Sequence, residues 1–476
     1  MRNIILIVLD TVRARNLSCF GYPEKTTPFL DTFCSKSSVY TDCITQSPWT
    51  LPSHASLFTG LYTSDHGCWS SRMDFSSWEG ETLAESLKKE GYYTCGISCN
   101  RLISRYYGFD RGFDTFIEAW NLFQDRGVNI VAQDRHTSGN SRRRVRWRIL
   151  KAIAGLRCKK ALNLIYDAKL FGRYDKGASR VTDRLLKRAL RQCAPPPFFL
   201  FLNLMEAHDP YDAPGAFKKR FADPSVKYHD IVKNFYDYVF SGEQSREKNK
   251  ILESLYNGEI YYLDSILKRS IKILQSEGLL DDTVLIITSD HGENIGDHHL
   301  LGHHFGLQHT LLHVPLIMHG SGIDQGCIQE GVEMRDIYHT ILEIAESRML
   351  RNKSDGYSLF EPAEHRTRFA EYISPLIPLE YILKQYPQFN DPEKLYREVK
   401  AAYRAGYKLE RYPDGEKRLY HIESDPDQHK DIRDIFPDRE RELEENITRH
   451  LSFIQEKGSF NISAETHRRL SALGYM

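Results

Sequence analysis

The sequence has no excess of charge of either sign. Lys and Arg together number 64, and Asp and Glu together number 64, so the 476-residue chain has zero formal net charge with His neutral. Without a basic surplus there is no electrostatic reason to expect a specific nucleic-acid partner. The length exceeds that of one typical domain and allows a large core, and the composition is ordinary for a folded enzyme.

Long apolar runs are also missing. The first segment, MRNIILIVLDT, has six consecutive apolar residues, Ile4 to Leu9, before Asp10. Such a run is too short for a signal peptide core with its cleavage site or for a transmembrane helix, and no other segment reaches about 18 apolar residues. The nine cysteines are scattered and show no zinc-site spacing. We therefore expect reduced thiols and a cytoplasmic location.

Short apolar segments alternate with amphipathic ones along the chain. Strands are expected within residues 4–9, 92–100, 197–205 and 283–290, and helices within 81–91 and 256–278. This alternation predicts an α/β fold with a large, mainly parallel sheet flanked by helices, in a catalytic domain over 1–360. Pro413-Asp414-Gly415 lies between two alternating runs and predicts a hairpin in a smaller, antiparallel α+β subdomain over 361–476.

One stretch is strongly basic. Residues 142–160 contain nine basic residues and no acidic one, within an insertion that we place at about 120–190. Val145, Ile149, Ile153 and Leu156 follow helical spacing, which predicts an amphipathic helix. Either its basic face is simply solvated, or it docks on an anionic polymer or membrane surface. The sequence predicts no oligomeric state.

Two of the expected strands end in acidic residues. Asp10 follows the first strand, and Asp290 with His291 follows the strand at 283–290. Ligand sites in open α/β sheets lie beyond the carboxyl ends of strands, and adjacent oxygen and nitrogen donors suit Zn²⁺, Mn²⁺ or similar ions. Asp10 alone would be read as a helix N-cap.

The segment SPWTLPSHASLFTG, Ser47 to Gly60, predicts the start of a helix, with Ser53 as its cap. Thr50 precedes that start, where free backbone N–H groups and the positive end of the helix dipole favour an anion. Beside a metal ion, the Thr50 hydroxyl can become a nucleophile.

Several motifs together resemble the sulfatase-type members of the alkaline phosphatase superfamily. They are NIILIVLDTVRARNLSCFGYPEKTTPFLD, TLPSHASLFTGLYTSDHG, GFDRGFDTF, FFLFLNLMEAHDPYDAP, YNGEIYYLDSIL, TSDHGENIGDHHLLGHHFGLQHTLLHVPLIMHGSG and YKLERYPDGEKRLYHIESDPDQ. They follow the family order over nearly the whole chain apart from the basic insertion. The resemblance implies an alkaline-phosphatase-like fold and a hydrolase acting on ester bonds.

The resemblance also implies roles for particular residues. The expected metal ligands are Asp10, Thr50, Asp290 and His291, around one divalent ion that is Mn²⁺, Zn²⁺, Mg²⁺ or Ca²⁺. The expected catalytic residues are Thr50, His208 and His303. The expected substrate-binding residues are His54, Asn100 and His304, and His304 also replaces His303 if the motifs align one residue later. His303 is expected to act as an acid, so activity that depends on it should fall above about pH 7.

Three departures from the family pattern bear on the substrate. Thr11 stands where a second acid is usual, Thr50 replaces the Cys or Ser that becomes formylglycine, and His54 replaces an Arg. These departures favour attack by Thr50 on a phosphate mono- or diester, on a small molecule or linked to a polymer. The alternatives are a sulfatase without formylglycine, a phospho-group transferase, a hydrolase in which Thr50 only positions water, and a binding protein without activity. The His cluster at 298–309 leaves a second metal ion open.

Overall fold

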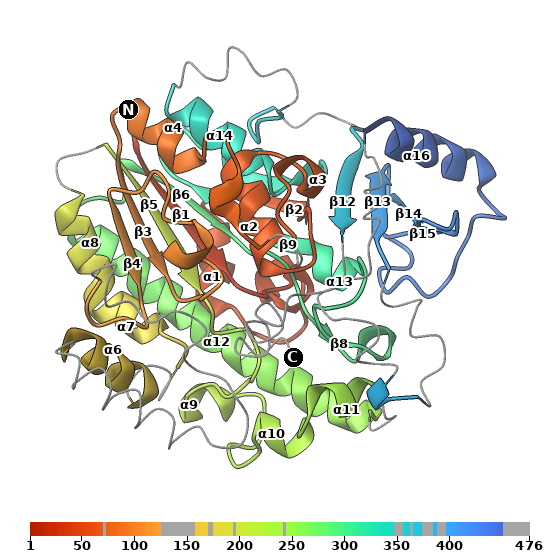
Figure 1. Ribbon diagram of the computed structural model, residues 1–476, viewed down its shortest axis with the longest axis horizontal. Helices are drawn as coiled ribbons and strands as arrows, with labels where there is room; N and C mark the ends of the chain where they lie inside the picture. Colours follow the sequence, from red (N-terminus) through yellow and green to blue (C-terminus); the bar gives the residue numbers. More distant parts are fainter. Residues whose placement is uncertain are drawn as a thin grey trace.

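The computed structural model describes residues 1–69, 73–124, 158–169, 175–193, 197–240, 244–346, 356–361, 365–373, 384–387 and 397–450. Figure 1 shows a large central sheet with helices packed around it and a smaller sheet beside it. The predicted fold class, a mainly parallel α/β sheet with a smaller antiparallel α+β region, is confirmed.

The central sheet has nine strands in the order β10-β2-β9-β6-β1-β5-β3-β4, with β11 also paired to β2. Strand β9 runs antiparallel to both β2 and β6, and the other pairings are parallel. The strands are β1 (Asn3–Leu9), β2 (Ser38–Ile44), β3 (Tyr93–Ser98), β4 (Thr115–Glu118), β5 (Phe198–Leu204), β6 (Thr283–Thr288), β9 (His313–His319), β10 (Gly326–Ile328) and β11 (Val332–Glu333). A short hairpin pairs β7 (Asn294–Ile295) with β8 (Leu301–Gly302).

Strand β1 lies at the centre of the sheet because all of its side chains are apolar apart from Asn3. Its seven residues are buried, and it pairs in parallel register with β5 on one edge and β6 on the other. A strand buried on both faces reads as a continuous apolar run, as expected of a parallel sheet covered by helices. The strands expected at 4–9, 92–100, 197–205 and 283–290 correspond to β1, β3, β5 and β6.

Two groups of helices flank the sheet (Figure 1). In one group α2, α4 and α14 contact one another, and in the other α12 contacts α1, α7 and α9. The helices are α1 (Pro28–Cys34), α2 (Thr50–Thr59), α3 (Thr63–His66), α4 (Leu83–Lys89), α6 (Cys158–Lys169), α7 (Ala178–Arg180), α8 (Leu186–Gln192), α9 (Gly215–Lys218), α10 (Tyr228–Ile231), α11 (Phe235–Phe240), α12 (Arg246–Ser276), α13 (His309–Leu312), α14 (Asp336–Ile344) and α16 (Pro437–His450).

Two helix starts differ from the sequence prediction. Helix α12 begins at Arg246, ten residues before the expected start, because the Ser245 hydroxyl accepts a hydrogen bond from the Lys248 N–H and caps it. Helix α2 begins at Thr50 itself, with Trp49 at the N-cap, so the interpretation of Ser53 as the cap was wrong. The Ser53 hydroxyl instead donates to the carbonyl of Ser47, 2.7 Å away.

The smaller sheet is antiparallel, in the order β12-β13-β14-β15, and α16 packs on β13 and β14. Its strands are β12 (Arg368–Tyr372), β13 (Val399–Arg404), β14 (Tyr407–Arg411) and β15 (Lys417–His421). The predicted hairpin at Pro413-Asp414-Gly415 joins β14 to β15, with Gly415 at a φ of 88°. The domain boundary at residues 360 and 361 stays a prediction.

The basic segment falls mostly outside the described residues, which resume at Cys158 with α6. Its docking role therefore stays a prediction. All nine cysteines are free thiols. Within the described ranges, no helix has the length and apolarity needed to cross a membrane. The cytoplasmic location stays a prediction.

Candidate active site

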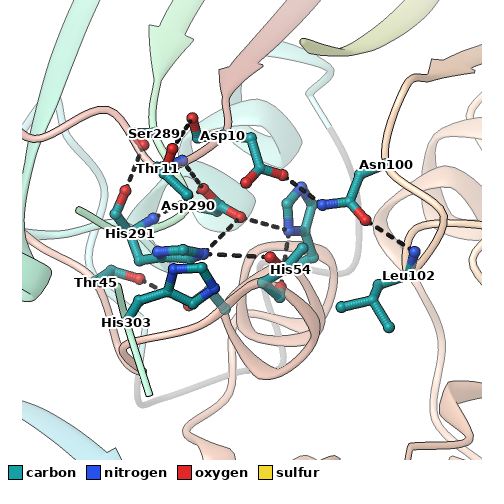
Figure 2. Close-up of polar contacts among 12 residues, drawn as sticks. Asp10, Thr11, Thr45, His54, Asn100, Leu102, Ser289, Asp290, His291 and His303 are labelled. Atoms are coloured by element: carbon teal, nitrogen blue, oxygen red, sulfur yellow. Dashed lines mark hydrogen bonds and ion pairs between the residues drawn. The ribbon is translucent and has the colours of Figure 1, made fainter. Parts of the chain in front are cut away.

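The predicted site residues converge at the carboxyl ends of four neighbouring parallel strands. Asp10 follows β1, Asp290 and His291 follow β6, His208 follows β5, and Asn100 follows β3. Figure 2 shows Asp10, Asn100, Asp290 and His291 close together at this edge. Thr50, the first residue of α2, reaches the same place, because its hydroxyl contacts His291. The order β6-β1-β5-β3 thus brings together residues separated by up to 281 positions, consistent with the rule that ligands bind at this edge of a parallel sheet.

Asp10, Asp290 and His291 form a cluster suited to a metal ion. Each offers one ligand atom, and these atoms lie within 4.8 Å of one another. All three residues are fully buried, and Asp10 Oδ1 and Asp290 Oδ2 have no hydrogen-bond partner among the described residues. Buried carboxylate oxygens without donors are costly unless a cation faces them, so this donor set fits a divalent ion.

The two carboxyl groups show the same need for a cation in their pKa values. Burial and, to a smaller extent, the nearby Asp290 carboxylate raise the pKa of Asp10 to about 6. Burial raises the pKa of Asp290 to about 7, although backbone N–H groups of Thr11 and His291 partly oppose this. A bound cation would reverse both effects because it stabilises the ionised forms.

His291 presents an unprotonated nitrogen to the cluster. Its Nδ1 lies 2.8 Å from the carbonyl of Gly292 and donates to it, so Nε2 carries the lone pair. Burial lowers the pKa of His291 to about 4, which keeps the ring neutral. Thr50 Oγ1 lies 3.2 Å from this Nε2, so the hydroxyl lies beside the same cluster as the two carboxylates. Geometry therefore brings Thr50 to the predicted metal ligands.

Two buried polar side chains, Asn100 and His54, contact this cluster and Thr50. Asn100 Nδ2 donates to Asp10 Oδ2 at 2.6 Å, and the Asn100 carboxamide oxygen accepts the N–H of Leu102. His54 Nδ1 donates to the carbonyl of Thr50 at 2.9 Å and lies 3.5 Å from Asp290 Oδ2. Asn100 and His54 therefore contact the predicted metal ligands and Thr50, and their expected substrate-binding role stays a prediction.

Asn203 contacts both Asn100 and His54 and was missed in the sequence. Its Oδ1 accepts the backbone N–H of Asn100 at 3.1 Å, and its Nδ2 lies 3.5 Å from His54 Nε2. Asn203 is fully buried within β5. A polar residue inside the apolar run FFLFLNL was the available signal, because a buried carboxamide needs partners.

Thr11 takes an unusual backbone conformation beside the cluster. Its φ is +61°, which is rare for a β-branched residue. The turn points the Thr11 N–H at Asp290 Oδ1, 3.2 Å away, while its hydroxyl donates to the carbonyl of Asp10. At this position, where a second acid is usual in the family, the Thr11 side chain thus bonds only to the neighbouring backbone, and the Thr11 N–H contacts the cluster.

Three histidines extend the site. His208 and His303 have ring centroids 5.3 Å apart, and His303 lies 4.4 Å from the ring of His291 and 4.9 Å from that of His304. Burial lowers the pKa of His208, but the Asp209 carboxylate, 2.9 Å from Nδ1, outweighs it and raises the value to about 10. His208 is therefore the charged imidazole of the site.

His303 does not have the protonation state expected of it. Burial and the neighbouring imidazoles hold the pKa of His303 well below its usual range, and burial lowers that of His304 to about 3. His303 Nδ1 lies 3.0 Å from Glu293 Oε1, and burial raises the pKa of that carboxyl well above its usual range. The expectation that a charged His303 acts as an acid near pH 7 is not supported, because the ring is neutral there.

The family model named Sulfatase matches residues 2–347, about three quarters of the chain. This chain belongs to the sulfatase family. The predicted resemblance is thereby confirmed, and with it the assignment as a hydrolase of the alkaline phosphatase superfamily acting on ester bonds. Members of this sulfatase family generally use a divalent metal ion, which agrees with the cluster at Asp10, Asp290 and His291.

The proteins to which this chain is similar in sequence or in fold carry names from both sulfate and phosphonate chemistry. Arylsulfatase K of Gallus gallus is 25% identical over 396 residues, which cover 75% of this chain and 65% of that protein. The phosphonate monoester hydrolase of Agrobacterium radiobacter has a TM-score of 0.68 at 17% identity and covers 96% of this chain and 99% of its own. A third protein was solved with its substrate D-glucosamine-2-N,6-O-disulfate, with a TM-score of 0.63 at 15% identity, covering 94% of this chain and 97% of that chain.

Proposed function

We propose that this sulfatase-family hydrolase cleaves the ester of a singly charged tetrahedral oxyanion, with Thr50 as the nucleophile. The observation that carries the proposal is the position of the Thr50 hydroxyl, 3.2 Å from His291 Nε2 and facing the carboxylates of Asp10 and Asp290. Thr50 is the first residue of α2, so the positive end of the helix dipole lies at the reacting oxygen.

The chain's own residues would divide the work as follows. Asp10, Asp290 and His291 would hold one divalent ion, which when bound supplies a Lewis acid that favours the deprotonated hydroxyl. The Thr50 hydroxyl lies 3.2 Å from His291 Nε2, so Thr50 would stand beside the ion, and the hydrogen bond from His54 to the Thr50 carbonyl fixes the first turn of α2. His208 contributes the positive charge that attracts the anion.

The reaction then has two balanced steps. The oxygen of Thr50 bonds to sulfur or phosphorus as the ester bond to the alcohol breaks, and the alcohol leaves with a proton. Water next attacks the same sulfur or phosphorus and restores the Thr50 hydroxyl, which releases sulfate from a sulfate ester, a phosphate monoester from a phosphodiester, or a phosphonate from a phosphonate monoester. If an acceptor alcohol takes the place of water, the same site transfers the group instead of hydrolysing it.

The charge of the site favours a singly charged ester. Asp10 and Asp290 offset the two charges of a divalent ion, which leaves the single charge of His208 facing the substrate. The Asp209 carboxylate forms an ion pair with His208, and because it is 35% exposed it offsets the His208 charge only in part. Sulfate monoesters, phosphodiesters and phosphonate monoesters carry one negative charge, whereas a phosphate monoester carries two near neutral pH.

Two ester classes remain candidates, each with a specific observation. The curated relatives named arylsulfatase K favour a sulfate ester, which is supported at least as well as a phosphate ester. The presence of Thr50 favours a phosphodiester or phosphonate monoester. The sulfatases that this chain resembles carry a Cys or Ser that becomes formylglycine, and the secondary alcohol of Thr50 cannot be oxidised to that aldehyde. The sugar disulfate named as the substrate of one structural neighbour supports an anionic, saccharide-linked ester as the substrate class for either candidate.

A panel of four esters tests the proposal: 4-nitrophenyl sulfate, 4-nitrophenyl phosphate, bis(4-nitrophenyl) phosphate and 4-nitrophenyl phenylphosphonate. Each is assayed with Mn²⁺, Zn²⁺, Mg²⁺ and Ca²⁺. We expect one of the singly charged esters to have the highest kcat/KM, and the identity of that ester decides between sulfate and phosphorus chemistry. Thr50→Ala should lower kcat by a factor on the order of 10³ or more, and Thr50→Ser should retain activity. Near-normal turnover by Thr50→Ala would remove Thr50 as nucleophile.

A further inference from the structure

A polar groove lies apart from the catalytic cluster. Its volume is about 690 Å³, and four segments distant in sequence form its walls. They are the first two turns of α12, the loop between β7 and β8, Arg15, and the loop that carries Asp427 and His429. A volume of this size accommodates a ligand as large as a disaccharide.

The lining of the groove suits a hydroxyl-rich ligand. Ile295 contributes the one apolar side chain among the described residues of the lining, and Gly296 has none. The other side chains are amides, a hydroxyl, imidazoles and charged groups, which offer hydrogen bonds in many directions. An aromatic or aliphatic ligand would find little to pack against here, whereas a polyol would find partners for its hydroxyl groups.

The carboxylates of the groove are already paired. Arg13 Nη1 lies 2.8 Å from Asp297 Oδ2, and Arg15 Nη1 lies 2.6 Å from Asp427 Oδ1. Arg13 Nη2 also lies 3.5 Å from Glu253 Oε1. Each carboxylate of the groove therefore lies beside an arginine, which weakens its repulsion of an incoming anion.

Two cations of the groove have no such partner. Arg246 and Lys250 lie four residues apart on α12, so their side chains share one face of the helix. Neither forms an ion pair with a described residue. Exposed cations with no protein partner, set in a polar groove, are the arrangement that recognises sulfate or phosphate groups.

We propose that this groove binds a polyol that carries several sulfate or phosphate groups, with Arg246 and Lys250 as its anion contacts. The site is separate from the catalytic cluster, because buried Arg13 lies between them. Arg13 contacts Asp297 and Glu253 on the groove side and donates to the backbone carbonyl of Glu293, whose side chain contacts His303. The proposal goes beyond the ester cleavage above and does not require it.

Calorimetric titration of the full-length protein tests the groove with three probes: sucrose octasulfate, inositol hexakisphosphate and unsubstituted sucrose. The variant is Arg246→Glu combined with Lys250→Glu, which should fold because acidic residues in the first turns of α12 are favoured by the helix dipole. The matched control is Lys268→Glu combined with Lys272→Glu, two exposed lysines farther along the same helix that make the same change in net charge.

We expect at least one polyanion to bind the wild type, with no detectable binding of sucrose. Its Kd should rise about tenfold or more in the groove variant and stay within about twofold in the control. The stronger of the two polyanions identifies sulfate or phosphate as the preferred group. Turnover of the 4-nitrophenyl esters should be unchanged in the groove variant, because Arg246 and Lys250 lie outside the catalytic cluster.

Three results would overturn the proposal. Neither polyanion binds the wild type, the groove variant binds as tightly as the wild type, or the control loses as much affinity as the groove variant. Binding through the basic segment at 142–160 would give the second result. If no nitrophenyl ester is hydrolysed but binding depends on Arg246 and Lys250, the proposed function fails while the groove site stands.

Discussion

Removal of the charge on Asp290 should stabilise the protein when no metal is present and destabilise it when metal is bound. In the metal-free protein the buried Asp290 carboxylate lies near that of Asp10, and burial raises the pKa of Asp290 from 3.8 to about 7. The folded state therefore binds this proton more tightly than the unfolded state. The resulting penalty is absent below about pH 4, grows as pH rises, and is complete above about pH 7.

The magnitude follows from the same pKa. A shift from 3.8 to about 7 costs about 4 kcal/mol at pH 8, at about 1.36 kcal/mol per tenfold change in proton affinity. Asp290→Asn abolishes that cost and keeps an oxygen to accept the N–H groups of Thr11 and His291. The new amide can donate to His291 Nε2, which lies 3.5 Å from the oxygen that it replaces. We expect a net gain of about 2–4 kcal/mol at pH 8.

Urea unfolding of the wild type and Asp290→Asn, at pH 5 and pH 8 and with EDTA or excess Mn²⁺ or Zn²⁺, provides the assay. In EDTA the variant should be the more stable protein at pH 8, and its advantage should shrink at pH 5. In metal the order should reverse, because the variant loses a charged ligand. Asp264 and Glu206 also have raised pKa values, about 7 and about 8, so the difference between the two proteins is the quantity to compare. A variant that is less stable than the wild type in EDTA at pH 8 would refute the reasoning.

Three further predictions concern residues around Thr50. If the charge of His208 attracts the substrate, kcat/KM should fall as pH rises through about 10. Asp209→Asn should move that fall to lower pH, because the Asp209 carboxylate raises the pKa of His208, and identical pH profiles of the two proteins would contradict this. Asn203→Leu should lower kcat by about tenfold or more with a smaller change in KM, because Asn100 and His54 lose their shared partner, and an unchanged kcat would contradict this. Thr11→Gly should preserve activity, since glycine accepts a φ of +61° and keeps the N–H that contacts Asp290. Thr11→Asp should lower turnover of the anionic ester because it adds a negative charge beside Asp10, and steady-state kinetics of both variants tests the two expectations.

The sequence was sufficient where one local pattern determines the structure. The run Ile4 to Leu9 could only be a buried strand, and Pro413-Asp414-Gly415 could only be a turn between alternating strands. The convergence of Asp10 with Asp290 followed from the rule that parallel strands place their carboxyl ends at one edge.

Where tertiary contacts decide, the sequence was not sufficient. Ser53 has a good capping side chain, yet α2 begins three residues earlier, where the chain leaves Trp49 in an extended conformation. Asn203 looks like an interruption of an apolar strand until β3 and α2 place Asn100 and His54 beside it. The lowered pKa of His303 depends first on burial and then on three other imidazoles, and no local pattern specifies either.

The central position of β1 has a consequence for synthesis of the chain. Residues 3–9 leave the ribosome well before their pairing partners, which are residues 198–204 and 283–288. Until about two fifths of the chain has been made, this almost wholly apolar strand has no neighbour on either edge, and its exposed backbone can pair with another nascent chain. The metal ion cannot help early, because its ligands at positions 10 and 290 meet only after β6 has docked. Yield in a heterologous host should therefore depend on chaperones that shelter the N-terminus during translation, and weakly on the supply of metal.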